Sequence, residues 1–172
     1  MSDAFGPIDP GVRIGHVHLK VADLERAIGF CRDVLGFEIT QRWGDSAAFL
    51  SAGGYHHHIA LNTWESLGGS PPPRGSTGLD HLAILYPTLA VLADALRRLL
   101  AADIALEVAT DHGVSEALYL RDPDGIGVEL YHDRPPDQWP RDASGAIAMS
   151  NRPLDLRSLL NESAEGRVRN RG

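Results

Sequence analysis

The chain has little cysteine, little lysine and no long apolar run, and each shortage excludes a class of protein. Cys31 is the only cysteine among 172 residues, so no internal disulfide can form, which fits a reducing cytoplasm. Lys20 is the only lysine and the net charge is -7, so the clustered basic face that nucleic acid or an anionic membrane needs is missing. No apolar run approaches the ~20 residues that span a bilayer, and no signal peptide is recognisable.

What the chain does contain is an internal repeat. The stretches Ile14–Lys20 and Leu79–Leu85 both place a histidine third and continue with alternating apolar residues. Each reaches a helix N-cap residue, Asp23 or Thr88, seven places after its histidine, and an amphipathic segment follows. The repeat therefore predicts two copies of a strand–helix–strands unit, and so an α+β fold.

The alternation of apolar and polar residues predicts where these elements lie. An irregular segment is expected at 1–12, a first unit at 13–64, a Gly/Pro-rich crossover at 65–78, a second unit at 79–133 and a C-terminal tail at 134–172. The expected strands are 13–21, 37–43, 47–52, 55–62, 79–86, 104–109, 115–121 and 126–132. The expected helices are 24–35 and 89–100, with a weak helical segment at 154–160 and frayed residues from 162 onward.

Two histidines and one glutamate are the candidate metal ligands. His16 and His81 hold the same place in the two units, and strand alternation turns both away from the helix side of their sheets. Glu129 alternates with the apolar Val128 and Leu130, so it faces the same way. A single strand histidine is usually structural, but the repeat brings these groups to one face independently. Two imidazoles and a carboxylate form the triad that leaves open coordination positions on non-haem Fe(II).

Three further residues are candidates for the surrounding site. Glu129 follows Gly125 by four residues and His58 follows Gly54 by four, so this count predicts that His58 shares the cavity. By alternation His57 is expected on the helix side, and surface decoration is the preferred interpretation for His56 and His57.

The segment before the last strand contributes the other two candidates. Tyr119 lies between the apolar Leu118 and Leu120 and is expected to point inward, while His112 lies at the cavity rim next to Gly113. Taken singly, either His112 or Tyr119 is as consistent with a structural role as with a functional one.

With these residues assembled, the chain resembles the vicinal oxygen chelate superfamily of glyoxalases, bleomycin resistance proteins and dioxygenases. Within that superfamily it is most similar to the extradiol, or catechol 2,3-, dioxygenases. The stretches that carry the resemblance are 15–21, 30–37, 55–59, 79–83, 118–125 and 128–131. Many such dioxygenases contain four modules, whereas two are present here, which leaves the walls of the pocket undefined.

The resemblance implies paired βαβββ modules that form a curved mixed sheet around a central metal, Fe(II) or more rarely Mn(II). His16, His81 and Glu129 match the metal ligands, and His58 matches the acid–base histidine. His112 and Tyr119 match residues that hydrogen-bond the substrate. The implied reaction inserts both atoms of O2 into a catechol-type substrate next to the diol and gives a semialdehyde, in an enzyme expected to be a homo-oligomer.

Three other functions occur on the same scaffold. Thiol transferases that act on a phosphonate epoxide need a cationic pocket, which Lys20 and scattered arginines do not supply. Glyoxalase I-like isomerases use a fourth protein ligand, usually glutamate, where this chain has His58. Bleomycin-type binding proteins sequester a drug without metal, so the histidine–glutamate trio counts against them.

Overall fold

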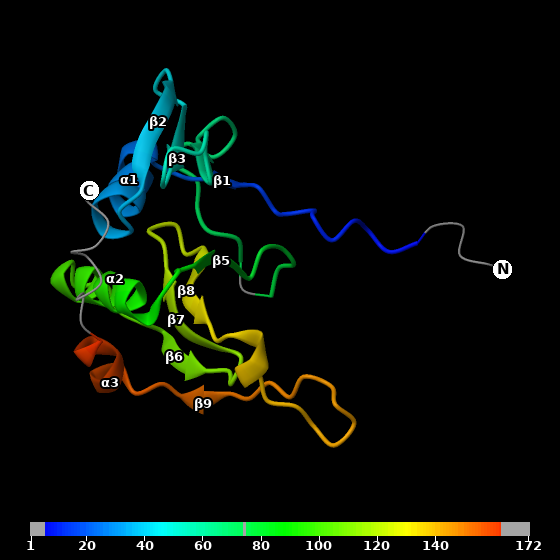
Figure 1. Cartoon of the computed structure of the whole chain (residues 1–172). Coiled ribbons are helices and arrows are strands. Elements are labelled where there is room, and N and C mark those ends of the chain that lie inside the picture. The colour runs from blue at the N-terminus through cyan, green and yellow to red at the C-terminus, as the bar shows by residue number, and fades with distance from the viewer. Residues whose placement is uncertain (1–5, 74, 163–172) are drawn as a thin grey trace, which may run out of the picture.

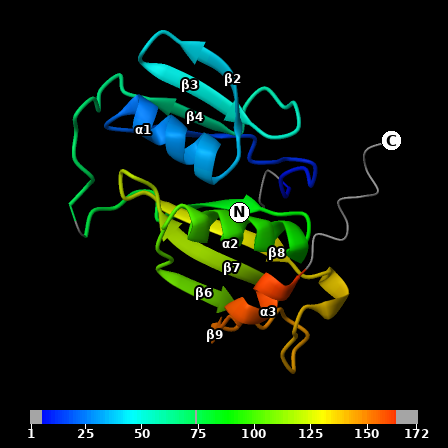
Figure 2. The same ribbon diagram turned by 90° about the vertical axis from the view of Figure 1, so that its left-hand side faces the viewer.

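Each half of the chain folds as a strand, a helix and three further strands, in the order that the repeat predicts. The structure is a computed structural model that describes residues 6–73 and 75–162. Its two units lie one above the other (Figures 1 and 2). Figure 1 shows β1 and β5 on the sides of the two units that approach each other. The expected frayed residues beyond 162 lie outside the described residues.

The first unit begins with a strand and a capped helix. Its elements are β1 (Val17–Lys20), α1 (Leu24–Gly29), a π-helical turn (Phe30–Val34), β2 (Glu38–Trp43), β3 (Ala47–Ser51) and β4 (Ile59–Asn62). The Asp23 side chain accepts a hydrogen bond from the Arg26 amide at 3.0 Å, as a helix N-cap does. Gly36 adopts a φ of 86°, the left-handed conformation that ends the helical segment.

The second unit repeats this plan and adds one strand. Its elements are β5 (His81–Leu85), α2 (Leu89–Ala101), β6 (Val108–Asp111), β7 (Ser115–Arg121) and β8 (Gly127–Asp133). A 3-10 turn (Pro136–Gln138), β9 (Arg152–Pro153) and α3 (Leu156–Asn161) follow in the tail. The Thr88 hydroxyl accepts a hydrogen bond from the Val91 amide at 3.2 Å, so the predicted N-cap is confirmed.

The strands form two mixed sheets, one in each of the paired units that the resemblance implied. Their orders are β1-β4-β3-β2 and β5-β8-β7-β6-β9, and the first strand of each unit pairs in parallel with the last strand of its βαβββ unit. Within the described residues, no ladder joins β1 to β5. The mixed α+β class is confirmed, and the two units are held together by side chains.

Three predicted strands begin four residues later than expected. The first strand starts at Val17 and not at residue 13, where its pairing with Ile59 of β4 begins. The fourth strand starts at Ile59 and not at residue 55, because Gly53 and Gly54 both take positive φ and the residues after them complete the turn. The strand predicted at 104–109 is displaced to Val108–Asp111. The Ile104 amide still bonds the Leu99 carbonyl at 2.9 Å, so the chain there is completing the end of α2.

One hydrophobic core runs through both units. It contains α1 residues such as Ile28, α2 residues such as Leu96, and strand residues such as Leu61 and Leu130, all at most 1% exposed. Each such side chain contributes about 1.5–3 kcal/mol through burial. Cys31 belongs to this core, and burial raises the pKa of its thiol to about 12, so it packs as a small apolar residue.

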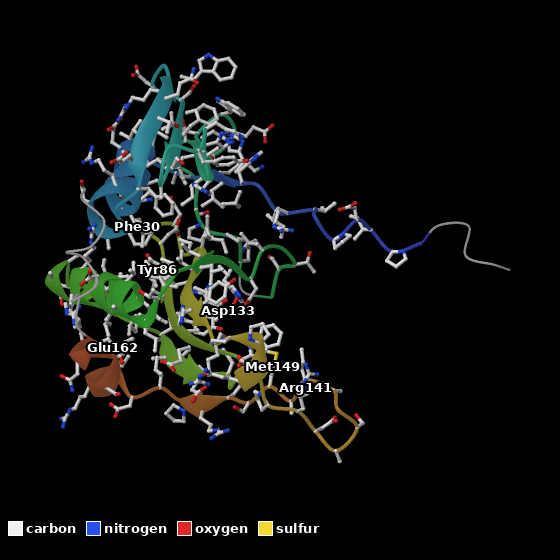
Figure 3. The ribbon with its side chains drawn as sticks, viewed as in Figure 1. Phe30, Tyr86, Asp133, Arg141, Met149 and Glu162 are labelled. Atoms are coloured by element: carbon white, nitrogen blue, oxygen red, sulfur yellow. The ribbon has the colours of Figure 1, made fainter. Side chains whose placement is uncertain are left out.

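The junction between the units combines apolar packing with an ion pair. Phe30, which is 6% exposed, faces the second unit, where it lines a small gap together with Leu82 and Val128 (Figure 3). Arg26 donates a hydrogen bond from Nη2 to Asp124 Oδ1 at 2.6 Å across the same junction. Among the described helices, none is long and apolar enough to cross a membrane.

Candidate metal and substrate site

The centre of the candidate site is a contact between His81 and Glu129 on neighbouring strands. Strands β5 and β8 run in parallel with His81 opposite Gly127, and His81 Nε2 lies 3.0 Å from Glu129 Oε2. The other ring nitrogen of His81 lies 2.8 Å from Asp80 Oδ2. A carboxylate on Nδ1 fixes the orientation of the ring and directs Nε2 toward a ligand, as is usual for metal-binding histidines.

Tyr119 extends this contact into a hydrogen-bonded chain. Strands β7 and β8 pair Tyr119 with Glu129, and the tyrosine hydroxyl donates to Glu129 Oε1 at 2.9 Å. Burial and this hydrogen bond raise the pKa of the Tyr119 hydroxyl, so it is a proton donor at neutral pH. The neighbours Leu118 and Leu120 are fully buried in the core, which confirms that Tyr119 faces away from the helices.

His112 forms the far end of the chain. Its Nε2 lies 2.9 Å from the Tyr119 hydroxyl, while its Nδ1 lies 3.1 Å from the Ser150 carbonyl oxygen and 2.8 Å from Asn151 Oδ1. Four of the six predicted site residues, namely His81, Glu129, Tyr119 and His112, are therefore linked in one network.

The other two predicted residues lie in the first unit and do not join that network. The His16 ring packs against His57, with ring centroids 4.3 Å apart, and approaches His56 at 6.5 Å. His57 also contacts Phe49 at 5.1 Å between centroids. The expectation that His57 faces the helix side is therefore wrong, because the irregular backbone before Ile59 does not follow strand alternation.

His58 is fixed by the end of β3. Its Nδ1 accepts a hydrogen bond from the Ala52 amide at 3.4 Å and lies 3.1 Å from the Ser51 hydroxyl. A backbone N–H can only donate, so in the neutral ring the proton is on Nε2. Within the described part of the chain, no hydrogen bond engages that nitrogen, and His58 thus presents an N–H donor.

The register of the sheets corrects the symmetry argument for His58. Val17 pairs with Ile59 in the first unit, and Leu82 pairs with Val128 in the second. When the two opening histidines are superposed, Ala60 holds the place of Glu129, and His58 holds that of Gly127. The count from the glycines is wrong because two more residues separate Gly54 from Ile59 than separate Gly125 from Val128.

The donor chemistry of the second unit fits a divalent ion. An imidazole nitrogen and a carboxylate oxygen 3.0 Å apart are the donors that Fe(II) and Mn(II) accept, and Asp80 and Tyr119 supply the supporting hydrogen bonds. His16 occupies the equivalent position at the start of β1. Over residues 6–73 and 75–162, however, no three histidine, cysteine, aspartate or glutamate side chains are grouped closely enough to hold a metal.

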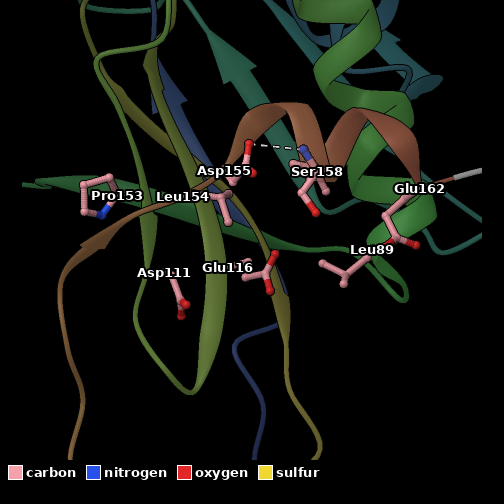
Figure 4. Close-up of a pocket in the computed structure, with 9 residues that line it drawn as sticks. Leu89, Asp111, Glu116, Pro153, Leu154, Asp155, Ser158 and Glu162 are labelled. Carbon is pink, nitrogen blue, oxygen red and sulfur yellow. Dashed lines mark hydrogen bonds between the residues drawn. The ribbon is translucent and has the colours of Figure 1, made fainter.

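A separate cavity of about 380 Å³ lies between α3, the start of α2 and the edge of the second sheet (Figure 4). Its acidic lining includes Asp111 and Glu116, and Arg134 bridges both carboxylates at 2.6 and 2.7 Å. None of the six predicted site residues lines it, so the cavity is not the candidate catalytic site.

Sequence reasoning missed three supporting groups. Asp80 could have been found, since it directly precedes His81 in the repeated stretch. Ser51 and Asn151 carry no such signal, because each meets its histidine only through folding, and Asn151 lies 39 positions from His112.

Two mixed sheets, each built from one strand–helix–three-strand unit, define an α+β protein of the paired βαβββ class. The family model described as "Glyoxalase/Bleomycin resistance protein/Dioxygenase superfamily" matches residues 13–130, and the chain belongs to this superfamily. A solved glyoxylase/bleomycin resistance protein/dioxygenase domain from Frankia sp. EAN1pec superposes with a TM-score of 0.60 at 27% identity. That alignment covers 72% of this chain and 98% of the Frankia chain.

Curated relatives carry dioxygenase names. The chain is 40% identical over 160 residues to a catechol-2,3-dioxygenase of Bacillus subtilis, covering 93% of this chain and 55% of that protein. It is 36% identical over 123 residues to biphenyl-2,3-diol 1,2-dioxygenase 3 of Rhodococcus globerulus, covering 70% of this chain and 63% of that protein. The chain thus spans between half and two thirds of the length of these relatives.

Proposed function

We propose that this chain acts in a metal-dependent extradiol dioxygenase that opens a catechol-type ring next to its two hydroxyl groups. The observation that carries the proposal is the network of His81, Glu129, Tyr119 and His112, in which a histidine–carboxylate pair adjoins a tyrosine donor and a second imidazole. The dioxygenase names of the relatives support the same class of reaction. The reaction consumes one diol and one O2 and forms one hydroxymuconic semialdehyde-type product.

In this proposal His16, His81 and Glu129 hold the metal, Fe(II) in preference to Mn(II). A bound divalent ion would lower the pKa of a catechol hydroxyl and bring the diol and O2 together. For this to happen His16 must leave its contact with His57 and turn toward the second unit. The exposed position of His16 leaves its ring room to reorient.

Tyr119 and His112 are proposed to hold the substrate. The Tyr119 hydroxyl keeps its proton, because burial and Glu129 raise its pKa, so it can donate to a deprotonated diol oxygen. His112 Nε2 lies within hydrogen-bond distance of the Tyr119 hydroxyl and would hold that hydroxyl in position while the substrate binds.

His58 is proposed as the proton donor of the ring-cleavage step. Because Ala52 occupies its Nδ1, the proton of the neutral ring is on Nε2, where it can be transferred to a reacting oxygen. Its position on the first unit would place this donor across the junction from the Tyr119 network.

The proposal is tested by reconstituting metal-free protein anaerobically with Fe(II), or in parallel with Mn(II), adding a catechol and then admitting air. We expect a yellow semialdehyde to form, O2 to be consumed in equal amount and a chelator to abolish the reaction. Absence of product with both metals across simple, alkyl-substituted and aryl-substituted catechols would exclude the proposed activity. Sedimentation of the same samples would test the expected homo-oligomer.

Substitutions in the histidine run test whether His58 is the proton donor. We expect His58→Phe to keep its metal and to lower kcat by about 100-fold, within the range for losing a general acid. His57→Phe retains the ring contacts to His16 and Phe49 and should lower kcat by less than about threefold. If the His57 variant were the impaired one, the proton donor would be His57 and not His58.

A further inference from the structure

Part of the tail beyond the second unit, residues 139–153, lies next to the candidate site. We call this segment the strap. The Trp139 indole donates to the Arg134 carbonyl at 2.7 Å, and β9 at the other end pairs with β6. Figure 3 labels Arg141 and Met149 on this strap at the lower edge of the second unit. The sequence assigned no role to this segment.

The strap holds the turn that carries His112. The Ser150 amide donates to the His112 backbone carbonyl at 2.9 Å. Gly113, with a φ of 78°, lies so close that an added Cβ would come within 3.0 Å of the Pro140 ring. Asp111 accepts hydrogen bonds from the Gly113 amide at 2.7 Å and from Arg134 at 2.6 Å.

The strap also determines which nitrogen of His112 carries a proton. A carbonyl oxygen can only accept, so the Ser150 carbonyl 3.1 Å from Nδ1 favours an Nδ1–H donor. Asn151 Oδ1 at 2.8 Å is a second acceptor for the same proton. In the neutral ring Nε2 is then a lone-pair acceptor, and it is this atom that lies 2.9 Å from the Tyr119 hydroxyl.

In this arrangement two acceptors compete for the hydroxyl proton of Tyr119. Tyr119 has a single O–H, yet both His112 Nε2 and Glu129 Oε1 lie 2.9 Å from its oxygen. With His112 held as an acceptor, the hydroxyl can turn from the carboxylate to the imidazole without moving its oxygen. A reacting diol could therefore displace either bond without disordering the tyrosine.

We propose that Asn151 is a positioning residue that, together with the Ser150 carbonyl, keeps His112 in its Nδ1-protonated tautomer and aims its Nε2 at Tyr119. The consequence for turnover rests on the proposed function, whereas the tautomer itself does not. The tail is thereby a working part of the site and not merely a cover for the sheet edge.

The first test is the tautomer of His112 in the metal-free wild-type chain. Histidine labelled with 15N, observed at pH 8.5 where an ordinary imidazole is neutral, reports the protonated nitrogen, and the His112→Gln spectrum assigns the signal. We expect Nδ1–H in the wild type and a mixture of tautomers in Asn151→Ala. An Nε2–H ring in the wild type, or an unchanged ring in Asn151→Ala, would overturn the proposal.

The second test uses turnover with Fe(II) and a catechol. Asn151→Ala should lower kcat about tenfold, a loss that corresponds to one hydrogen bond, and should leave the metal content unchanged. Asn151→Asp should restore kcat, because its carboxylate also accepts a hydrogen bond. Met149→Ala, at an exposed neighbouring position, should match the wild type. Equal losses in Asn151→Ala and Asn151→Asp would contradict the positioning role. If the wild type cleaves no catechol, the proposed function fails and the tautomer alone decides this proposal.

Discussion

Glu129→Ala is expected to remove the bound metal and the ring-cleavage activity together. Glu129 is 9% exposed and its two oxygens engage His81 and Tyr119 at 3.0 and 2.9 Å, so its removal takes away both contacts at once. Loss of a group that merely supports a metal ligand costs 10–100-fold, and loss of the ligand itself should exceed about 100-fold in kcat/KM. Elemental analysis and the colour assay on the same sample measure both effects.

Two matched variants make this result specific. Glu129→Gln keeps an oxygen that can accept from Tyr119 but removes the charge, so we expect a folded protein that binds metal weakly. Glu107→Gln removes the carboxylate directly before β6, which pairs with Arg121 at the surface, and it should leave metal content unchanged. Stoichiometric metal in Glu129→Ala would refute the assignment of Glu129 as a ligand.

Gly127→Ala is the second variant with a large expected effect. Gly127 is opposite His81 in the parallel ladder, and an added Cβ would lie 2.8 Å from His81 Cβ and closer still to the Asp80 carbonyl. Its φ is not in the left-handed region, so the requirement for glycine is one of space. The methyl group should push β5 away from β8, costing about 1–3 kcal/mol of unfolding free energy and separating His81 from Glu129.

Urea unfolding and metal titration measure the two consequences of Gly127→Ala. We expect a lower midpoint with an unchanged m-value, together with metal affinity reduced at least tenfold. Gly29→Ala is the matched control, because its added Cβ meets only Asp33 Oδ2 at 3.8 Å within the helical segment. That variant should be neutral or slightly more stable. Wild-type affinity in Gly127→Ala would show that the β5–β8 spacing does not set the site.

Much of the fold could be predicted because its signals are local. The N-caps Asp23 and Thr88 and the helix end at Gly36 depend on side-chain or backbone preferences within a few residues. Strand β7 has the predicted bounds, because apolar and polar residues alternate along it without a glycine or bulge. The β4 and β6 starts were misplaced where a turn or a helix end held the chain before pairing began.

The candidate site was only partly accessible to the same reasoning. Strand alternation correctly predicted that Tyr119 and Glu129 face the same side of the sheet, since side chains in a regular strand follow a period of two. It failed for His57, which belongs to a turn and not to a strand. It could not detect Asn151, whose contact with His112 depends on a strap that pairs across the sheet edge.

By itself, the sequence determined the duplication, the order of elements and the residue types available to bind a metal. Repeats and periodicities can be recognised along the chain without knowledge of which segments pack together. The tertiary structure alone decided that the strands divide into two sheets and that His81, Glu129, Tyr119 and His112 form one network while His16 packs with His57. The reason is physical, because register and junction packing depend on which backbones approach closely. A two-residue difference in turn length places His58 at the position that corresponds to Gly127 and not at the one that corresponds to Glu129.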